Sequence, residues 1–264
     1  MEDVDRNPMA GEVFVHIPYS EFSRYLPQVK KERVNLEIFF DGDNLDQLRQ
    51  EELDTVVSVL REGRLKCTIH GPYQNLSPGS ADSKIREVTF HRFIQTIELA
   101  DRLKPELVVF HPGFDPWRFQ GIVEQWFTNS LDTWKQILKS SEGVGVPLAL
   151  ENVFEFAPDN LLQLVSSIGS PRFGLCFDTG HYNVFAKRPL SRWIEMFRPF
   201  LMEVHLHDNH GKLDEHLALG EGNFPFGELF GLLRRSESSP LLTIEAHNEK
   251  AVRKSLISLG NYLK

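Results

Sequence analysis

Short apolar runs recur along the chain and alternate with segments whose apolar residues follow helical spacing. Eight of these runs have the length and the nearly continuous apolar character of strands buried on both faces. They span residues 13–18, 34–40, 67–70, 107–111, 147–151, 174–178, 202–207 and 241–245. The amphipathic segments between them include 84–104, 121–141, 160–167, 190–197 and 226–235. The pattern therefore predicts strand and helix in alternation throughout.

Eight strand–helix units in 264 residues predict an α/β protein that forms a single (β/α)8 TIM barrel, with residues 1–264 as one domain. The alternative is a doubly wound open sheet. That fold favours a glycine-rich phosphate turn after an early strand, but the segment that follows the first run, PYSEFSRYLPQ, contains no glycine. The barrel is therefore the favoured fold.

Composition adds weak constraints on partners and location. No run of eighteen apolar residues occurs and residues 2–12 are polar, so we expect no membrane span and a cytoplasmic protein. The formal net charge of −8 counts mildly against nucleic acid, because it provides no field that attracts a phosphate backbone. No stretch of the sequence marks an interface between subunits.

Histidine, aspartate and glutamate side chains, which can bind a metal or transfer protons, stand at the ends of six consecutive predicted strands. In a barrel of this kind the active site lies at these ends. These residues are His70, His111, Glu151, Asp178, His205 and Glu245, with His181, Asp214 and His216 in the loops that follow. Because burying such groups is costly, six strands that end this way need a common cause, and a divalent cation provides one. Imidazole and carboxylate without thiolate suit Zn, Mn, Fe or Co, and we expect one to three ions, with Zn or Mn the first candidates.

Two histidines in the run from Phe200 to Asn223 receive a different interpretation. We expect His207 and His210 to belong to a polar surface loop, with His207 pointing away from His205. His16 and Glu37, in the first two predicted strands, either face the barrel mouth or make internal hydrogen bonds.

Seven segments resemble the xylose isomerase-like barrel superfamily, which contains sugar isomerases and epimerases as well as apurinic/apyrimidinic endonucleases of the endonuclease IV type. They are HGPYQNL, VVFHPG, LALEN, FDTGH, VHLHDN, DEHLALGEG and TIEAH. The epimerase branch implies one metal ion held by Glu151, Asp178, His205 and Glu245. It also implies Glu151 and Glu245 as the catalytic acid/base pair and His181 as a catalytic residue oriented towards the substrate.

The endonuclease branch implies three zinc ions, and each of its nine ligand positions has a suitable residue in this chain. These are His70, His111, Glu151, Asp178, His181, His205, Asp214, His216 and Glu245. The parts that would face DNA differ from that branch: the loop FFDGDNLDQ is acidic, Glu215 stands where an arginine is expected, and FDTGH replaces a motif that usually contains DTCH.

The sequence thus favours a metal-dependent isomerase or epimerase acting on a small sugar or sugar phosphate. The alternative is a trinuclear phosphodiesterase acting on abasic DNA or another phosphate ester, for which alone nucleic acid would be a partner. A third hypothesis is a binding or regulatory barrel that retains a metal.

Overall fold

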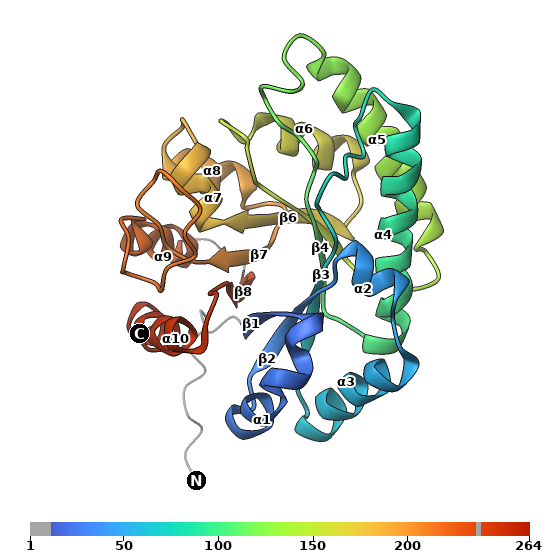
Figure 1. Ribbon diagram of the computed structural model, residues 1–264. Coiled ribbons are helices and arrows are strands. Elements are labelled where there is room, and N and C mark those ends of the chain that lie inside the picture. The colour runs from blue at the N-terminus through green and yellow to red at the C-terminus, as the bar shows by residue number, and fades with distance from the viewer. Residues whose placement is uncertain (1–11, 236–238) are drawn as a thin grey trace.

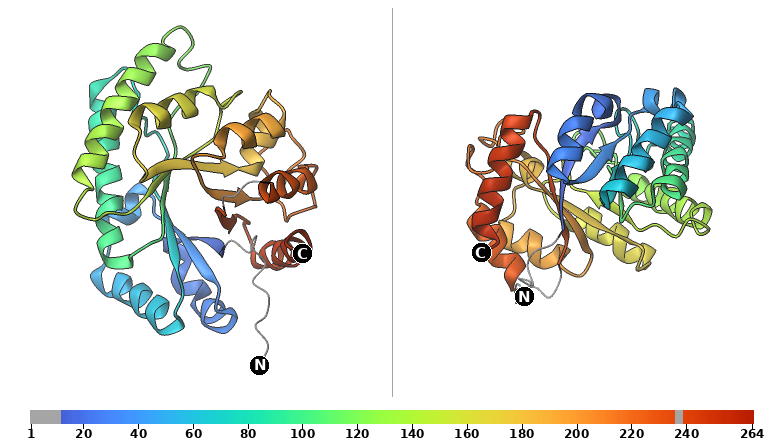
Figure 2. Two further views of the ribbon diagram at one scale, coloured as in Figure 1. Left: turned by 180° about the vertical axis from the view of Figure 1, so that it is seen from behind. Right: turned by 90° about the horizontal axis from the view of Figure 1, so that it is seen from below.

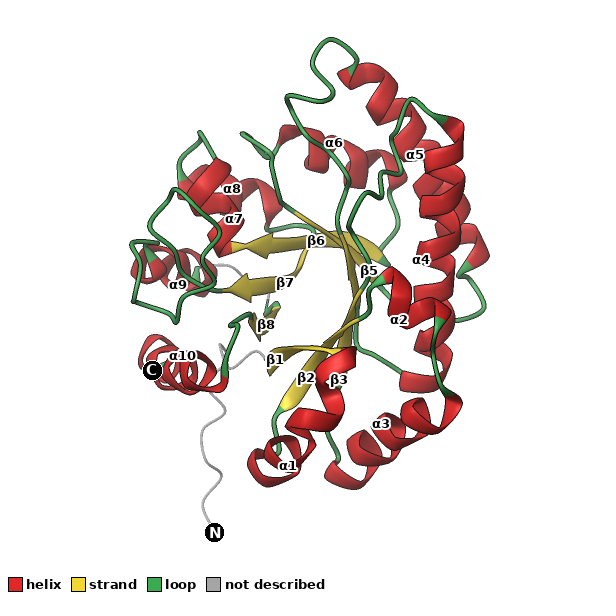
Figure 3. Cartoon of the chain, viewed as in Figure 1, coloured by secondary structure: helices red, strands yellow, loops and turns green. Residues whose placement is uncertain are grey.

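The computed structural model describes residues 12–235 and 239–264, and its core is a closed barrel of eight parallel strands (Figure 1, Figure 3). The strands are β1 (Val13–Pro18), β2 (Asn35–Phe39), β3 (Cys67–His70), β4 (Val108–Phe110), β5 (Leu148–Glu151), β6 (Phe173–Asp178), β7 (Leu201–Leu206) and β8 (Leu241–Ile244). Each strand pairs with the next, and β8 closes the circle on β1 through the pair Val13 and Leu242. The predicted TIM barrel is confirmed. The open-sheet alternative is wrong, because an open sheet leaves its edge strands unpaired.

Helices surround the barrel (Figure 2). They are α1 (Phe22–Glu32), α2 (Gly42–Asp46), α3 (Gln50–Gly63), α4 (Ser83–Leu103), α5 (Val123–Ser140), α6 (Asp159–Ile168), α7 (Thr179–Phe185), α8 (Leu190–Phe197), α9 (Phe226–Arg234) and α10 (Glu249–Tyr262), with a short 3-10 turn at Tyr19–Glu21. Within the described residues, no helix combines the length and the apolar character needed to cross a membrane.

The observed strands lie within one or two residues of the predicted ranges. His111, His207 and Glu245 each fall one residue beyond the end of a strand, where the chain leaves the ladder to begin the following loop. These positions are at the carboxyl ends of the strands, so the loops after the strands, rather than the strands alone, present part of the chemistry.

The main apolar core lies between the barrel and its ring of helices. Trp134 on α5 is fully buried and packs against Phe93 of α4 at 5.2 Å and Phe173 of β6 at 5.3 Å between ring centroids. Strands β3 to β6 are buried along their whole length, which explains their continuous apolar sequences. This packing of the helices against the barrel fixes the positions of the strands and of the side chains at the strand ends.

The barrel interior contains both apolar and polar side chains. A small apolar cluster of Leu107, Val109, Ala149 and Cys176 is separate from the outer core. Alternation along the strands also directs Glu37, Thr68, Glu203 and Thr243 inward, and all four are fully buried. Polar and charged groups therefore occupy the barrel interior below the residues at its mouth.

We expect Trp134→Ala to lower the free energy of unfolding by about 3–5 kcal/mol, because it leaves a large cavity between helices and barrel. Trp117→Ala is the matched control, since the Trp117 side chain is 63% exposed, and it should change the free energy by less than about 0.5 kcal/mol. Urea unfolding followed by circular dichroism measures both. Equal losses in the two variants would contradict this account of the core.

Candidate metal centre and active site

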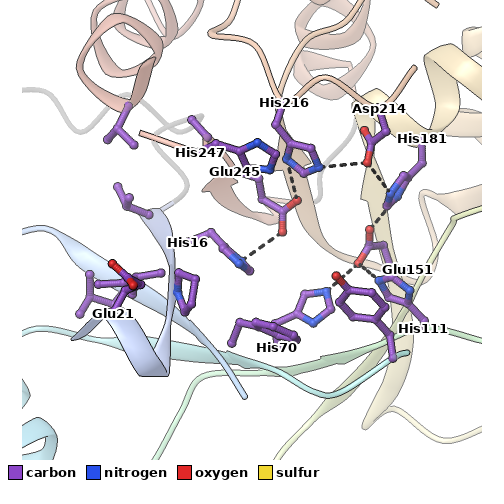
Figure 4. Close-up of a pocket in the computed structure, with 18 of the residues that line it drawn as sticks. His16, Glu21, His70, His111, Glu151, His181, Asp214, His216, Glu245 and His247 are labelled. Carbon is purple, nitrogen blue, oxygen red and sulfur yellow. Dashed lines mark hydrogen bonds and ion pairs between the residues drawn. The ribbon is translucent and has the colours of Figure 1, made fainter. Parts of the chain in front are cut away.

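Four side chains, at the ends of β5, β6 and β7 and just after β8, converge at the barrel mouth. Figure 4 shows two of them, Glu151 and Glu245. His205 Nδ1 lies 3.5 Å from Glu151 Oε2, 4.0 Å from Asp178 Oδ2 and 3.2 Å from Glu245 Oε1. Ligands at metal–ligand distances of about 2.0–2.2 Å in a tetrahedral site are separated by about 3.4 Å. The distances from His205 Nδ1 to the three carboxylates are therefore close to those between ligands of one ion.

Glu151, at the end of β5, is the centre of a second group of contacts. Its Oε2 atom lies 3.0 Å from His70 Nε2 and 3.3 Å from His111 Nε2, and its Oε1 atom lies 2.9 Å from His181 Nδ1. The side chain is only 1% exposed. Glu151 thus touches imidazoles from β3, from the loop after β4 and from α7, in addition to His205.

The long loop after β7 brings a third group to the same mouth. Asp214 Oδ2 lies 3.0 Å from His216 Nε2 and 3.5 Å from His181 Nε2. His216 has a left-handed backbone with φ of 49°, and its ring stacks against His247 with centroids 4.4 Å apart. All nine candidate ligands therefore belong to one connected cluster.

The prediction for His207 is wrong. Its side chain is fully buried, and its Nε2 atom lies 2.9 Å from Asp178 Oδ2. Its ring stacks parallel to His216 with centroids 3.9 Å apart. The physical reason is the strand period of two, which places residues i and i+2, here His205 and His207, on the same side. His210 is exposed and paired with Glu215, as expected for a surface loop.

Gly180 makes room for the His207 ring. A Cβ at this position would overlap three atoms of that imidazole, so only glycine fits while His207 stays bound to Asp178. Asp178 also caps α7 by accepting a hydrogen bond of 2.6 Å from the His181 backbone N–H. Glycine at position 180 of the FDTGH segment is therefore required by His207, a residue much later in the chain.

Opposite charges stabilise each other in this cluster. Burial alone would raise the pKa of Glu151, but the imidazoles of His111 and His205 outweigh it and hold that pKa well below its usual value. Burial would likewise raise the pKa of Glu245, and His205 and His16 reverse the effect. The reciprocal interactions raise the pKa of His205 well above its usual value against the effect of burial. A bound metal would replace these protons as the positive partner of the carboxylates.

The ring of His205 is held from both sides. Its Nε2 atom lies 3.2 Å from Glu37 Oε2, and Glu37 Oε1 accepts a hydrogen bond of 2.9 Å from His16 Nδ1. Despite its burial, Glu37 has its pKa lowered to about 2, with His205 and His16 the main opposing causes. A carboxylate behind a histidine fixes which ring nitrogen faces a metal, so Glu37 directs His205 Nδ1 towards the mouth.

Glu203 was missed by the sequence reasoning. It lies two residues before His205 on β7, is fully buried, and interacts with Thr243 of β8. Burial and the charge of Glu37 raise its pKa to about 8, so it is mostly protonated at neutral pH. The signal that could have found it is a carboxylate in the middle of an apolar strand, since such a group is costly to bury without a partner.

Buried polar atoms that lack a hydrogen bond of good geometry support the fit of a metal ion to this site. Among the described residues these include Glu151 Oε1 and both ring nitrogens of His205, which have close neighbours but no hydrogen bond of good geometry. Groups such as His70, His205 and Glu245 place one ligand atom each within 4.8 Å of one another. The donors are imidazole nitrogens and carboxylate oxygens, which suit Zn or Mn.

Comparison with known proteins defines the class. A family model described as xylose isomerase-like TIM barrel matches residues 35–262, and the chain belongs to this family. The uncharacterized protein MJ1311 of Methanocaldococcus jannaschii is 32% identical over 209 residues, covering 76% of this chain and 71% of that protein. The resemblance seen in the sequence is thus confirmed at the level of the family.

Solved structures show the same barrel. A D-tagatose 3-epimerase-like protein is 27% identical with a TM-score of 0.84, covering 94% of this chain and 96% of that chain. A Thermus thermophilus protein soaked with ZnCl2 is 24% identical with a TM-score of 0.80, covering 95% of this chain and 97% of that chain. An L-ribulose 3-epimerase is 17% identical with a TM-score of 0.76, covering 96% and 94% in the same order. Sugar epimerases are thus among the structural neighbours, although the last two likenesses show the fold alone.

We expect Glu37→Gln to weaken binding of Zn or Mn by about 10- to 100-fold, because the carboxylate that orients His205 is lost. Competition with a chromogenic chelator measures the affinity directly. Glu106→Gln is the matched control, because Glu106 is an exposed carboxylate 3.7 Å from Lys66, before the start of β4 and away from the carboxyl ends of the strands. Unchanged affinity in Glu37→Gln would contradict the assigned role.

We expect Gly180→Ala to lower the free energy of unfolding by about 1–3 kcal/mol, as overpacking does in a filled core. In a His207→Ala background the same substitution should cost less than about 0.5 kcal/mol, since the space is then free. A double-mutant cycle by urea unfolding tests this coupling. Additive effects would show that Gly180 does not serve His207.

Proposed function

We propose that this protein is a divalent-metal-dependent isomerase or epimerase of a small sugar. The observation that carries the proposal is the placement of two carboxylates on different walls of the barrel. Glu151 of β5 and Glu245, just after β8, lie within 3.5 Å and 3.2 Å of the same His205 nitrogen. Two carboxylates that reach one centre from different directions suit removal of a proton from carbon and its return from another side.

Glu151, Asp178, His205 and Glu245 would hold the ion, with Zn or Mn the first candidates. When bound, such an ion polarises the carbonyl and hydroxyl oxygens of a ketose and so acidifies the neighbouring C–H bond. The protein's own part is then to hold the sugar, exclude water and move the proton.

The charge states suit both carboxylates as bases. The pKa values of Glu151 and Glu245 are both held well below the usual value, so each is ionised at neutral pH and can accept the carbon-bound proton. Glu245 Oε1 lies 3.2 Å from His16 Nδ1. Burial alone would lower the His16 pKa, but Glu245 and Glu37 raise it to about 10. His16 therefore keeps a proton beside the ionised Glu245, and transfer of that proton to the Glu245 carboxylate would supply the one that returns to carbon.

The cavity over this centre is poor in free cations. Arg24, Arg118 and Arg253 are the only Lys or Arg side chains that line it in the described part of the chain. Arg24 is paired with Glu21, and Arg253 is paired with Glu32 and Glu249. Since a phosphate needs several cationic or N–H partners, this lining favours an unphosphorylated sugar over a sugar phosphate or abasic DNA.

Aromatic side chains provide the complementary surface. The cavity is lined by five aromatic residues from the end of β2, the loops after β3, β4 and β5, and the end of α7, namely Phe39, Tyr73, Phe114, Phe154 and Phe185. Tyr73 stacks on His111 with centroids 4.4 Å apart, beside Glu151. Aromatic walls around a few convergent polar groups are typical of pockets for small organic ligands.

A phosphoesterase with several metal ions is the second candidate, and one observation favours it. Besides the four proposed ligands, the described residues form further groups with metal-ligand spacing, including His70, His111 and Glu151, and His207, Asp214 and His216. One tightly bound ion per chain, measured by mass spectrometry for metals after dialysis, supports the isomerase. Three ions per chain support the phosphoesterase.

The proton transfer can be tested with D-tagatose, L-ribulose and D-psicose, the sugars named for the structural neighbours. We expect deuterium from heavy water to enter the carbon next to the carbonyl of at least one of these ketoses, with epimer or isomer formed in parallel. Removal of the metal by a chelator should abolish both, and added Zn or Mn should restore them. Absence of exchange with every ketose would contradict the proposal.

Glu151→Gln and Glu245→Gln should each lower the rate of exchange by about 10²- to 10⁴-fold, because each removes a group that carries the proton. Metal content must be measured alongside, since both residues are also proposed ligands. Glu155→Gln is the control, as Glu155 is equally buried but does not line the cavity. Normal turnover in metal-loaded Glu245→Gln would exclude the two-carboxylate mechanism.

A further inference from the structure

The cavity at the barrel mouth continues into a groove on the outside of the barrel. Its lining runs from the residues of the metal centre past His16 and Glu21 to α1 and α10, and its volume is about 1220 Å³ (Figure 4). Helices α1 and α10 flank β1 in the views of Figure 1 and Figure 2. We call the part between these two helices the side groove. Its walls include Val15, Val29, Val34, Val252 and Leu256.

The side groove exists because helices do not fully cover the outer face of β1. Every residue of β3, β4, β5 and β6 is buried, as expected where helices cover a barrel strand. In β1, Val13 and Val15 remain partly exposed although they are apolar. Val34, just before β2, and Val252 and Leu256 on α10 are also only partly buried. A strip of apolar surface thus borders a space connected to the reaction centre.

The two arginines beside the side groove are both paired with carboxylates. Arg24 lies 2.8 Å from Glu21, and Arg253 lies 3.0 Å from Glu32 and 2.8 Å from Glu249. The Arg253–Glu32 pair joins α10 to α1 across the groove. With three carboxylates beside two paired arginines, the side groove disfavours a phosphate or another anion and suits an uncharged group.

The cavity therefore has two ends of different chemistry. One end presents buried carboxylates and imidazoles, and the other presents a strip of aliphatic side chains bordered by polar residues and paired charges. Ligand pockets for drug-sized molecules usually measure about 300–1,000 Å³, so this cavity is larger than a single monosaccharide requires. A molecule that fills both ends must carry a polar head and an apolar substituent.

We propose that the side groove binds an apolar substituent of the substrate, so that the substrate class is a sugar attached to an alkyl, isoprenoid or aryl group. This inference rests on the proposed function for the identity of the polar head. The open connection to Glu245 and His16 is the reason for assigning the groove to the substrate. A docked chain segment or a second copy of the protein would need no such connection.

Binding of two glycosides with the same head tests the proposal without catalysis. The probes are n-octyl β-D-glucopyranoside, below its critical micelle concentration, and methyl β-D-glucopyranoside, titrated calorimetrically into the metal-free and the metal-loaded protein. Since each buried methylene strengthens binding by about 4-fold at most, the longer chain should make the octyl compound bind at least about 10-fold more tightly even when burial is incomplete. Equal affinities would overturn the proposal.

Substitutions on α10 locate the binding. Val252→Trp fills the side groove and Val252→Glu places a charge in it, and each should remove the advantage of the octyl over the methyl probe. Val88→Trp is the matched control, because Val88 on α4 is also a valine, is 53% exposed and lines no part of the cavity or of the space between α1 and α10. Circular dichroism checks that each variant folds. An octyl advantage that survives both Val252 variants would overturn the assignment.

The remaining outcomes are equally decisive. A dimer that dissociates in Val252→Trp, measured by analytical ultracentrifugation, would assign the groove to a second copy of the chain and contradict the proposal. Because the probes are bound without turnover, loss of the octyl preference leaves the proton-exchange test of the proposed function unaffected. Conversely, tighter binding of the octyl compound without deuterium exchange into any ketose would support the assignment of the side groove. It would contradict the proposed isomerase or epimerase reaction.

Discussion

The structure depends on mutual neutralisation of carboxylates and imidazoles at one end of a closed barrel. Glu151, Asp178 and Glu245 would repel one another if they were the only charges there. His205, fully buried between them, lies within 4.0 Å of all three. The apolar core between barrel and helices stabilises the fold. The charged cluster itself adds little stability, because buried ion pairs rarely repay their desolvation.

The same cluster extends inward along the barrel axis. Glu37 supports His205 from behind and also binds His16, which in turn lies beside Glu245. Hydrogen bonds and ion pairs therefore connect the proposed ligands to the proposed proton carriers. The distances from His205 Nδ1 to the three carboxylates suit a bound metal.

Around this centre, shape and charge narrow the range of substrates. The acidic segment after β2 forms the short helix α2, capped by Asp41, and offers no basic surface. The cavity is walled by aromatic residues near the centre and by aliphatic residues along β1. Both features are suited to an uncharged organic molecule, and they weigh against a polyanion even though the ligand set resembles that of an endonuclease.

The sequence by itself determined the barrel and the strand ends that carry the candidate ligands, because the apolar period identifies the strands and a parallel barrel gathers their carboxyl ends at one mouth. It could not decide how side chains on different strands meet. The burial of His207 against Asp178, the need for glycine at position 180 and the support of His205 by Glu37 all join residues distant in the chain. The side groove likewise depends on how α1 and α10 pack around β1, and only tertiary structure sets that packing.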